Sequence, residues 1–409
     1  MNVRAERFPL MDSVRAIACL TVVAFHTAFF AGMYTSDSVL RPYLAQATWS
    51  VAVFFAISGF LLYRPFVRAR LKDEPWPRVG PYAVRRFMRI VPAYWLALTV
   101  VAVWLSLDIV IDPAWHVPLF YGFGQIYTAP TSISGLAQGW TLCVEVTFYA
   151  FLPLWALAMR RRGVRAELLA LAALAAASFG WKLFATRHVQ PSALDSGPWL
   201  MPLPNFLDQF AAGMALAVVS VRGLPDLLER ATRRALPWWL LAAVAYWVMC
   251  TRIGLDGRLS DRITRPQFLL RHELNIVVAV GLLVPTIFAA ERGGAVRRLL
   301  AWRPLLFVGL VSYGIYLWHE AIVHQIAKGI SHWLRDTVGL GVDARFAVLA
   351  ALTLGAALPI ATASYYGLER PLLRRGWRFG GDPGAAQPGE ALAEPAPESP
   401  PPASTIART

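Results

Sequence analysis

Three side chains that can carry charge, Asp12, Arg15 and His26, lie inside the first apolar segment of the chain, residues 10–30. Arg15 and His26 are eleven residues apart, so on a helix they share nearly one face, roughly 16 Å apart along the axis. Asp12 stands one turn before Arg15. A charge near the centre of a bilayer costs about 3 kcal/mol or more, and ionisable residues there usually face a cavity and serve function. This spacing indicates a membrane enzyme with a cation at one depth and a titratable base at another.

The composition places the chain among helical membrane proteins. Of its 409 residues, 57% are hydrophobic and only 16% are charged, whereas soluble domains average about 25% charged residues. Apolar stretches long enough to cross a bilayer recur along the sequence, which predicts an all-α, polytopic protein of about ten transmembrane helices. The predicted spans are 10–30, 48–64, 89–109, 139–159, 166–185, 204–221, 236–252, 271–290, 305–327 and 346–368.

The basic residues set the predicted orientation. Arginines cluster in alternate connecting segments, such as 64–89 and 160–165, whereas 108–138 contains no Lys or Arg. Because basic loops stay on the cytoplasmic side, we expect both termini in the cytoplasm and a multi-pass protein of the cell (inner) membrane. The segment 252–271 is an exception, since it is basic on the predicted outer side.

The net charge of +14 does not indicate a nucleic-acid partner. The basic residues alternate with membrane spans and leave no soluble domain to present a basic face, so their expected contacts are anionic membrane lipids. Three cysteines in apolar segments predict neither disulfides nor a metal site. Residues 1–378 are expected to form one integral-membrane domain, and residues 379–409, rich in Pro, Ala, Glu and Ser, a disordered cytoplasmic tail.

The rise of a helix gives an expected depth for each polar residue in a span. By this count His26, Glu145 and His319 share the outer half of the membrane, on three different helices. Arg15 lies nearer the cytoplasmic side. There it is joined by basic residues at the ends of other spans, namely Arg64, Arg85, Arg86, Arg89 and Arg370. Arginine binds phosphate through a planar fork of donors, so a phosphate-bearing cytosolic donor could dock at this end.

Simpler interpretations of the same residues stay open. Topology alone explains most loop arginines, and the Arg15 side chain could extend to the interface. His26, Glu145 and His319 could be structural residues within the helix bundle. The aromatic side chains could belong to the core or to an interfacial belt; they are Trp140, Tyr149, Tyr313, Tyr316 and Trp318.

Six short motifs, in the correct order, resemble those of one family. They are the spacing of Asp12, Arg15 and His26; Phe54–Leu61 (FFAISGFL); Arg85–Tyr94 (RRFMRIVPAY); Trp140–Tyr149 (WTLCVEVTFY); Ser312–His319 (SYGIYLWH); and Glu369–Pro371 (ERP). On these residues the chain resembles the integral-membrane acyltransferase type 3 family over about residues 8–375. That family O-acetylates or O-acylates polysaccharides, lipid-linked sugars and some glycosylated metabolites.

The resemblance implies a membrane O-acyltransferase that uses an acyl-CoA donor, with acetyl-CoA as the expected one, and no metal. A carbohydrate, a lipid-linked sugar or a glycosylated metabolite would be the acceptor. His26 would act as general base on the acceptor hydroxyl, since imidazole titrates near neutral pH. Glu145 would orient that imidazole, and Arg15 would hold the CoA phosphates.

The residues that this hypothesis assigns fall into three sets. The catalytic set is His26, Glu145 and Arg15. The cofactor-binding set is Arg15, Arg85, Arg86, Arg89, Ser58 and Gly59. The substrate-binding set is Asp12, Trp140, Tyr149, Tyr313, Trp318 and His319.

Two other classes of function stay open. A transporter or flippase of a lipid-linked sugar also needs buried Arg, His and Glu residues along its path, but it consumes no thioester. A non-catalytic sensor or scaffold of the cell envelope would tolerate loss of His26. Within the acyltransferase hypothesis a covalent acyl-histidine is open, whereas the sequence has no Gly-x-Ser-x-Gly motif for a serine acyl-enzyme.

Overall fold

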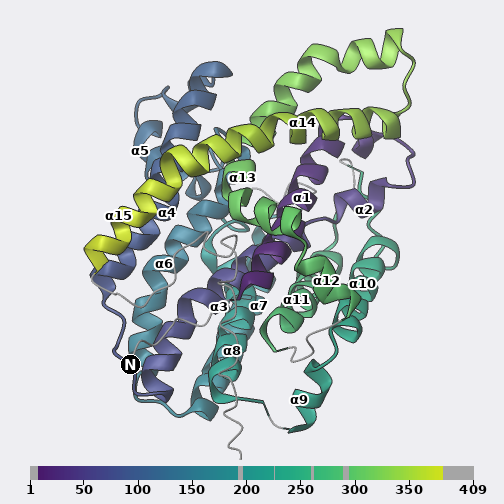
Figure 1. Cartoon of the computed structure of the whole chain (residues 1–409). Helices are drawn as coiled ribbons and strands as arrows, with labels where there is room; N and C mark the ends of the chain where they lie inside the picture. The colour runs from purple at the N-terminus through teal and green to yellow at the C-terminus, as the bar shows by residue number, and fades with distance from the viewer. Residues whose placement is uncertain (1–7, 192–196, 225, 259–261, 289–293, 381–409) are drawn as a thin grey trace, which may run out of the picture.

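The computed structural model of the protein describes residues 8–191, 197–224, 226–258, 262–288 and 294–380. Every regular element within these residues is a helix, which confirms the predicted all-α polytopic fold (Figure 1). The expected disordered tail lies outside the described residues from position 381 onward, so the domain boundary stays a prediction.

Ten helices correspond to the ten predicted spans. They are α1 (Pro9–Phe30), α3 (Trp49–Leu71), α4 (Val79–Trp104), α6 (Trp140–Met159), α7 (Val164–His188), α8 (Leu207–Arg222), α10 (Ala235–Thr251), α11 (Arg265–Ile287), α13 (Arg303–His332) and α14 (Val342–Ser364). Shorter helices connect them, namely α2 (Arg41–Ala45), α5 (His116–Tyr121), α9 (Asp226–Thr232), α12 (Ala295–Leu300) and α15 (Arg370–Gly380). Single turns occur at 33–35, 108–110, 125–127, 137–139, 203–205, 333–337 and 365–369.

Eight helical stretches in the described part of the chain are long and apolar enough to cross a membrane. The two remaining predicted spans correspond to shorter helices, since α8 has 16 residues and α10 has 17. A helix of that length falls just short of the roughly 20 residues that a bilayer core requires. The ten-span prediction therefore gave the right segments, with the short length of α10 predicted correctly and that of α8 overestimated by two residues.

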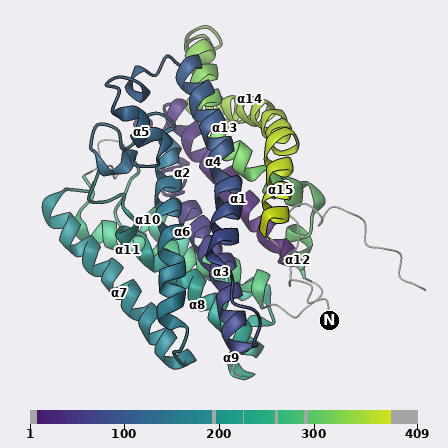
Figure 2. The same cartoon turned by 90° about the vertical axis from the view of Figure 1, so that its left-hand side faces the viewer.

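Helices that are distant in the sequence pack together in the centre of the bundle. α3 packs along α8, α1 packs along α13, and α13 packs along α14. Figure 1 shows α1 beside α13, and Figure 2 shows α15 beside α4. This arrangement brings the first and the ninth predicted spans into direct contact, so that polar residues from both can face one space.

Two glycines allow α3 and α8 to approach closely. A β-carbon on Gly213 would lie 2.0 Å from the carbonyl oxygen of Ala56, and one on Gly59 would lie 2.3 Å from that of Phe210. Small residues at helix contacts are typical of membrane bundles, where packing drives helix association. Gly59, which we predicted as a cofactor contact, therefore packs against the α8 backbone.

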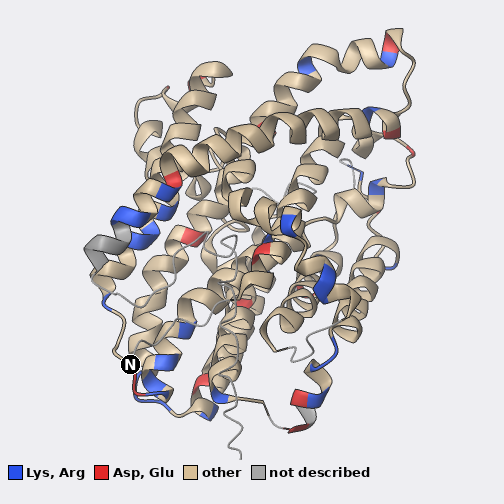
Figure 3. Cartoon of the chain, viewed as in Figure 1, with Lys and Arg blue, Asp and Glu red and all other residues tan. Residues whose placement is uncertain are grey.

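The end of the bundle at which α1 begins is called the inner end below, and the opposite end the outer end. Figure 3 shows ribbon segments coloured for Lys and Arg gathered where α15 lies beside α4. The first turns of α4 contain Arg85, Arg86 and Arg89, and α15, which packs against α4, contains Arg370 and Arg374. The cytoplasmic location of this end follows from the charge pattern and stays a prediction.

The basic outer segment that departs from the charge rule has local acidic partners. Arg41 of α2 donates through Nη2 to Oδ1 of Asp256 at 2.7 Å and through Nε to the Asp256 carbonyl at 3.0 Å. Arg258 donates to Asp256 and to Asp37. The Arg41 hydrogen bond holds the pKa of Asp256 below its usual value. Arg41 and Arg258 therefore tie two outer loops together, and acidic residues compensate the charge of Arg258, one of the five arginines of the segment 252–271.

We expect Gly213→Ala and Gly59→Ala each to lower the midpoint of thermal unfolding in detergent. The added methyl group has to push α3 and α8 apart, and overpacking of this kind costs about 1–3 kcal/mol. Gly355→Ala on α14 is the matched control, because a β-carbon there meets nothing within 4 Å. An alanine at such an open helical site gains roughly 0.5–1 kcal/mol. Equal midpoints for all three variants would contradict the close α3–α8 contact.

Candidate active site

Two cavities open inside the bundle, one above the other. The outer cavity has a volume of about 430 Å³ and the inner cavity about 130 Å³. Among the described residues, three line both cavities: Val51, Thr141 and Tyr316. The outer volume lies in the range of about 300–1,000 Å³ that is typical of small-molecule sites. The inner volume lies below that range and suits a narrow part of a ligand.

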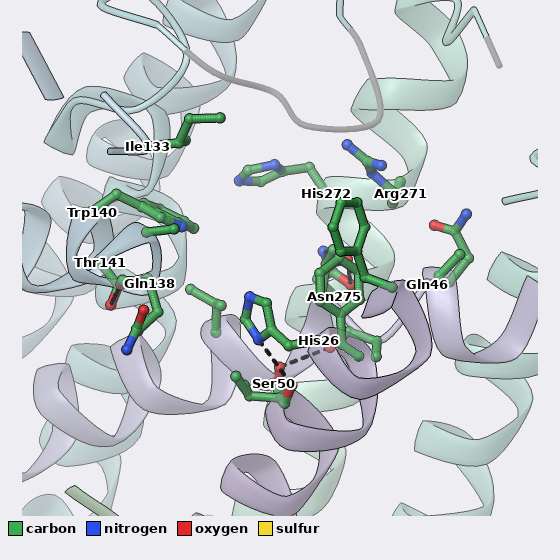
Figure 4. Close-up of a pocket in the computed structure, with 18 of the residues that line it drawn as sticks. His26, Gln46, Ser50, Ile133, Gln138, Trp140, Thr141, Arg271, His272 and Asn275 are labelled. Atoms are coloured by element: carbon green, nitrogen blue, oxygen red, sulfur yellow. Dashed lines mark hydrogen bonds between the residues drawn. The ribbon is translucent and has the colours of Figure 1, made fainter. Parts of the chain in front are cut away.

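His26 lies in the wall of the outer cavity. Figure 4 shows its ring between two groups of side chains. On one side are Gln138, Trp140 and Thr141, from the start of α6 and the turn before it. On the other side are Gln46, Arg271, His272 and Asn275. A ligand in the cavity would therefore touch the imidazole and polar groups from several helices at once.

A second histidine fixes the proton positions on His26. His319 on α13 is fully buried, and its Nδ1 lies 3.1 and 2.9 Å from the carbonyl oxygens of Ile315 and Tyr316. Since carbonyls only accept, this Nδ1 carries a proton, and Nε2 of the neutral ring is an acceptor. The Nε2 atom of His319 lies 3.0 Å from Nδ1 of His26.

The His26 ring is then left in one tautomer. Its Nδ1 lies 3.0 Å from Nε2 of His319 and 3.1 Å from the carbonyl oxygen of Val22, so both neighbours of this nitrogen are acceptors. Nδ1 therefore carries the proton, and Nε2 of neutral His26 has a lone pair. No hydrogen bond to this Nε2 is formed within the described part of the chain. The pair thus presents an imidazole nitrogen that can accept a proton from a molecule in the outer cavity.

Glu145 lies with the arginines of the inner cavity. Its carboxylate accepts hydrogen bonds of 2.8 Å from the hydroxyls of Ser58 and Tyr149. The inner cavity is also lined by Arg15, Arg86 and Arg89. The expectation that Glu145 holds the His26 imidazole is therefore wrong for this structure, in which His319 takes that place.

The depth of Glu145 was misjudged because α6 begins deep inside the bundle. Gln138, just before α6, donates through Nε2 to the carbonyls of Tyr316 and Leu317 at 3.1 and 2.9 Å. Those carbonyls lie near the middle of α13, which runs from Arg303 to His332. The segment between α4 and α6 forms the outer cover of the bundle, so a count that starts at the membrane surface places Glu145 too far out.

The inner cavity combines guanidinium groups with aromatic rings. The Arg89 guanidinium lies 5.6 Å from the Tyr313 ring centroid and 3.7 Å from a Glu369 carboxylate oxygen. Arg86 lies 6.0 Å from the Tyr149 ring centroid. Contacts of this length are typical of cation–π pairs. The arginines are thus held in place while they still line the cavity.

The other predicted residues divide between the two cavities and the core. Trp140 lines the outer cavity, whereas Ser58, Tyr149 and Tyr313 line the inner one. Arg15 bonds Asp12, with 2.7 Å between Nη1 and Oδ1. Some predicted residues line neither cavity; these are Asp12, Gly59, Arg85, Trp318 and His319. Of these, His319 reaches the site through its bond to His26.

A small hydrogen-bonded group separates the two cavities. The Tyr316 hydroxyl lies 2.9 Å from the Gln138 carbonyl oxygen and 2.7 Å from the Thr141 hydroxyl. It therefore donates to the carbonyl and accepts from Thr141. This group closes the space between the arginines below and His26 above.

Several polar residues that line the outer cavity were not predicted as functional from the sequence. Gln138, Thr141, Asn205 and Gln209 are uncharged and stand at the ends of apolar segments, where they resemble ordinary loop or cap residues. Arg271 and His272 gave a stronger signal, because an Arg-His pair begins the predicted span 271–290. Within the described residues no group of three His, Cys, Asp or Glu side chains could hold a metal ion, and the three cysteines are free and buried.

Comparison with known proteins places the chain in a family. The family described as "Acyltransferase domain" matches residues 9–365. The exopolysaccharide production protein ExoZ of Rhizobium meliloti is 31% identical over 347 residues, which cover 80% of this chain and 89% of that protein. The acyltransferase MdmB of Streptomyces mycarofaciens is 25% identical over 398 residues, which cover 88% and 91% of the two chains.

A further relative is the peptidoglycan O-acetyltransferase OatA of Listeria monocytogenes. It is 21% identical over 336 residues, which cover 77% of this chain and 49% of that protein. No solved structure is significantly similar to the chain. The family match extends from α1 through α14 and contains both cavities and the His26–His319 pair. The chain therefore belongs to the Acyltransferase domain family and is a multi-pass membrane acyltransferase.

Proposed function

We propose that the protein transfers an acyl group from acyl-CoA, with acetyl as the expected group, to a hydroxyl of a carbohydrate or glycosylated acceptor. The observation that carries this proposal is the stacking of two chemically different cavities. The inner one is lined by three arginines, the outer one contains a lone-pair nitrogen of His26, and they meet at Thr141 and Tyr316. The names of two relatives, an exopolysaccharide production protein and a peptidoglycan O-acetyltransferase, support a carbohydrate acceptor.

The donor would enter at the inner end. Arg15, Arg86 and Arg89 offer planar guanidinium forks, which bind phosphate oxygens in pairs. The inner cavity of about 130 Å³ is too small for a whole CoA molecule, so the phosphates would lie at its mouth and the narrow pantetheine arm inside it. This direction of entry agrees with a location in the cell (inner) membrane and with a cytosolic source of acyl-CoA.

The reaction needs one base and no bound metal. Nε2 of His26 would take the proton of the acceptor hydroxyl as its oxygen attacks the thioester carbonyl carbon. The carbon–sulfur bond then breaks, and the CoA thiolate takes the proton back from the imidazolium. The products are the acyl ester and CoA, so atoms and protons balance. His319 would keep Nδ1 of His26 protonated throughout, as a positioning residue.

The constriction would have to open during each turnover. The Tyr316–Thr141 hydrogen bond stands between the donor cavity and His26, so the end of the acyl-pantetheine arm can reach the imidazole only when this pair parts. Thr141 and Tyr316 are both buried, so we expect them to part with a collective motion of α6 and α13, on a timescale of microseconds or longer. A pair that stays closed in the absence of acceptor would also keep water in the outer cavity away from the thioester.

The first test compares variants of three histidines, His26 on α1 and His319 and His324 on α13. His26→Ala should lower the release of CoA from acetyl-CoA by about 10²–10⁴-fold, the usual contribution of a positioned base. The measurement is thioester consumption by the purified full chain in detergent, with a cell-envelope glycan extract as acceptor. His319→Ala should lower kcat about tenfold at unchanged KM for acetyl-CoA, because it removes one orienting hydrogen bond.

Two further variants separate orientation from packing. His319→Gln should recover part of the kcat, because its amide oxygen can accept a hydrogen bond from the Nδ1–H of His26. His324→Ala is the matched control, since His324 lies on the same helix and packs on Phe30 instead of His26. Wild-type turnover in the His26→Ala protein would refute the base assignment. No CoA release with any acyl-CoA, from folded protein that still binds a lipid-linked sugar, would favour a transporter.

The donor site is tested by charge removal in the inner cavity. Arg86→Ala should weaken acetyl-CoA binding, measured by calorimetry, by about tenfold or more, since a hydrogen bond to a charged group contributes roughly 1.5–3 kcal/mol. Arg161→Ala is the control, because Arg161 lies on the exposed loop after α6. Equal affinities for the two variants would place the CoA phosphates elsewhere.

The constriction is tested by removing one hydroxyl. Tyr316→Phe should raise the hydrolysis of acetyl-CoA in the absence of acceptor by about two- to tenfold, the effect of losing one neutral hydrogen bond. Tyr94→Phe is the control, because its buried hydroxyl bonds the Phe120 carbonyl outside both cavities. Hydrolysis at the wild-type rate in Tyr316→Phe would mean that this pair does not control access of water to the thioester.

A further inference from the structure

We propose that the outer cavity binds a molecule that carries an organic ammonium group, and that the carboxylate of Glu320 is the group that pairs with it. Among the described residues, Glu320 is the one acidic side chain that lines this cavity. The inference deepens the proposed function and rests on it in one respect, because it takes the molecule in the outer cavity to be the acceptor. It names a charge that this acceptor would carry.

The carboxylate of Glu320 lacks a partner from the protein. It makes no hydrogen bond or ion pair within the described part of the chain, whereas Glu145 in the inner cavity accepts two hydrogen bonds. The Glu320 side chain is half-buried, and both of its carboxylate oxygens remain accessible. An acidic residue inside a membrane bundle is costly and usually pairs or faces a functional cavity. A cation on a ligand is the group that complements this one.

The neighbours of Glu320 on α13 place it beside the outer end of α1. His319, the residue before it, lies 3.0 Å from His26. His324, one turn after it, packs on Phe30 with 5.5 Å between the ring centroids. Residues four apart share one face of a helix, so Glu320 and His324 both face the side of α13 that is next to Phe30. The carboxylate therefore lies near the level of His26 along the bundle.

Aromatic rings from the outer end of α1 and the turn after it line the same cavity. They are Phe25, Phe29, Phe30 and Tyr34. The ring centroids of Phe29 and Phe30 lie 5.3 Å apart, and those of Phe25 and Tyr34 lie 5.6 Å apart. The faces of aromatic rings attract ammonium groups, most strongly where water is excluded. One carboxylate among aromatic rings suits an organic ammonium group, whereas a metal cation needs several oxygen ligands.

Two arginines, Arg258 and Arg271, also line the outer cavity. Neither forms an ion pair with Glu320. Arg258 donates instead to Asp37 and to Asp256. Acidic side chains of the outer loops therefore already compensate the charge of Arg258, and Glu320 is not needed for that purpose.

Arg271 lies on the other side of the cavity. Figure 4 shows it across from Thr141, whose hydroxyl oxygen lies 2.7 Å from that of Tyr316. Tyr316 comes one helical turn before Glu320 on α13, so Glu320 belongs to the side of the cavity where Thr141 lies. A ligand can therefore approach Glu320 without meeting Arg271 first. An anionic ligand bound at Arg271 is the competing outcome that the experiment has to separate.

The experiment compares two ligands that differ in charge and hardly in shape. Choline carries a quaternary ammonium group, and 3,3-dimethylbutanol has a carbon atom in place of that nitrogen. Binding to the full chain is measured by saturation-transfer NMR in a maltoside detergent, without any acyl-CoA. We expect the Kd of choline to be about tenfold or more below that of dimethylbutanol, because only choline can pair with the carboxylate and the ring faces.

Three variants locate the site. Glu320→Gln keeps the size of the side chain and removes its charge, so it should raise the Kd of choline by about tenfold and leave that of dimethylbutanol unchanged. Glu229→Gln is the matched control, because Glu229 is exposed on α9 and lines neither cavity. Phe30→Leu should raise the Kd of choline by about two- to fivefold, the loss of one cation–π contact, and change that of dimethylbutanol less.

Three results would overturn the inference: no preference for choline over dimethylbutanol, tighter binding of the anionic analogue 3,3-dimethylbutyrate, or an unchanged Kd of choline in Glu320→Gln. Because no thioester takes part, the result is independent of the proposed acyl transfer. Choline binding through Glu320, without CoA release that depends on His26, would keep the ammonium site and remove the proposed reaction. CoA release that depends on His26, with no preference for choline, would do the reverse.

Discussion

Hydrocarbon offers no hydrogen-bond partners, so every polar side chain inside this bundle needs a partner from the protein or from a ligand. Most of them have one. Lys182 pairs with Asp208, and His319 bonds both the α13 backbone and His26. Nε2 of His26 makes no hydrogen bond within the described part of the chain, and His26 lies in the wall of the outer cavity. The same constraint that stabilises the fold therefore leaves one basic nitrogen for a ligand.

The contact between α1 and α13 organises both cavities. α1 places Arg15 in the inner cavity and His26 in the outer one, while α13 places Tyr313 below, Tyr316 at the constriction and His319 behind His26. The three α13 residues follow at intervals of three, so they share one side of that helix. Because two rigid helices set these positions, the separation of charge and base is a property of the bundle and not of a mobile loop.

Much of the fold could be predicted because it depends on local composition. The ten predicted spans coincide with ten helices, and the periodic placement of Arg15 and His26 put both toward the interior. The partner of His26 could not be predicted by counting residues along spans. That count assumes that each helix starts at the membrane surface, whereas α6 starts at the level of Tyr316. Gly59 was misassigned for a related reason, since its contact with Phe210 depends on how α8 packs.

The structure separates two environments that the sequence shows as scattered polar residues. The inner cavity is lined by Arg15, Arg86 and Arg89 around the carboxylate of Glu145. The outer cavity joins the His26 imidazole to uncharged side chains, to two arginines, Arg258 and Arg271, and to the carboxylate of Glu320. The guanidinium groups of the inner cavity suit the phosphates of the proposed donor. Because the two cavities share Thr141 and Tyr316, the proposed donor and acceptor would meet at that constriction.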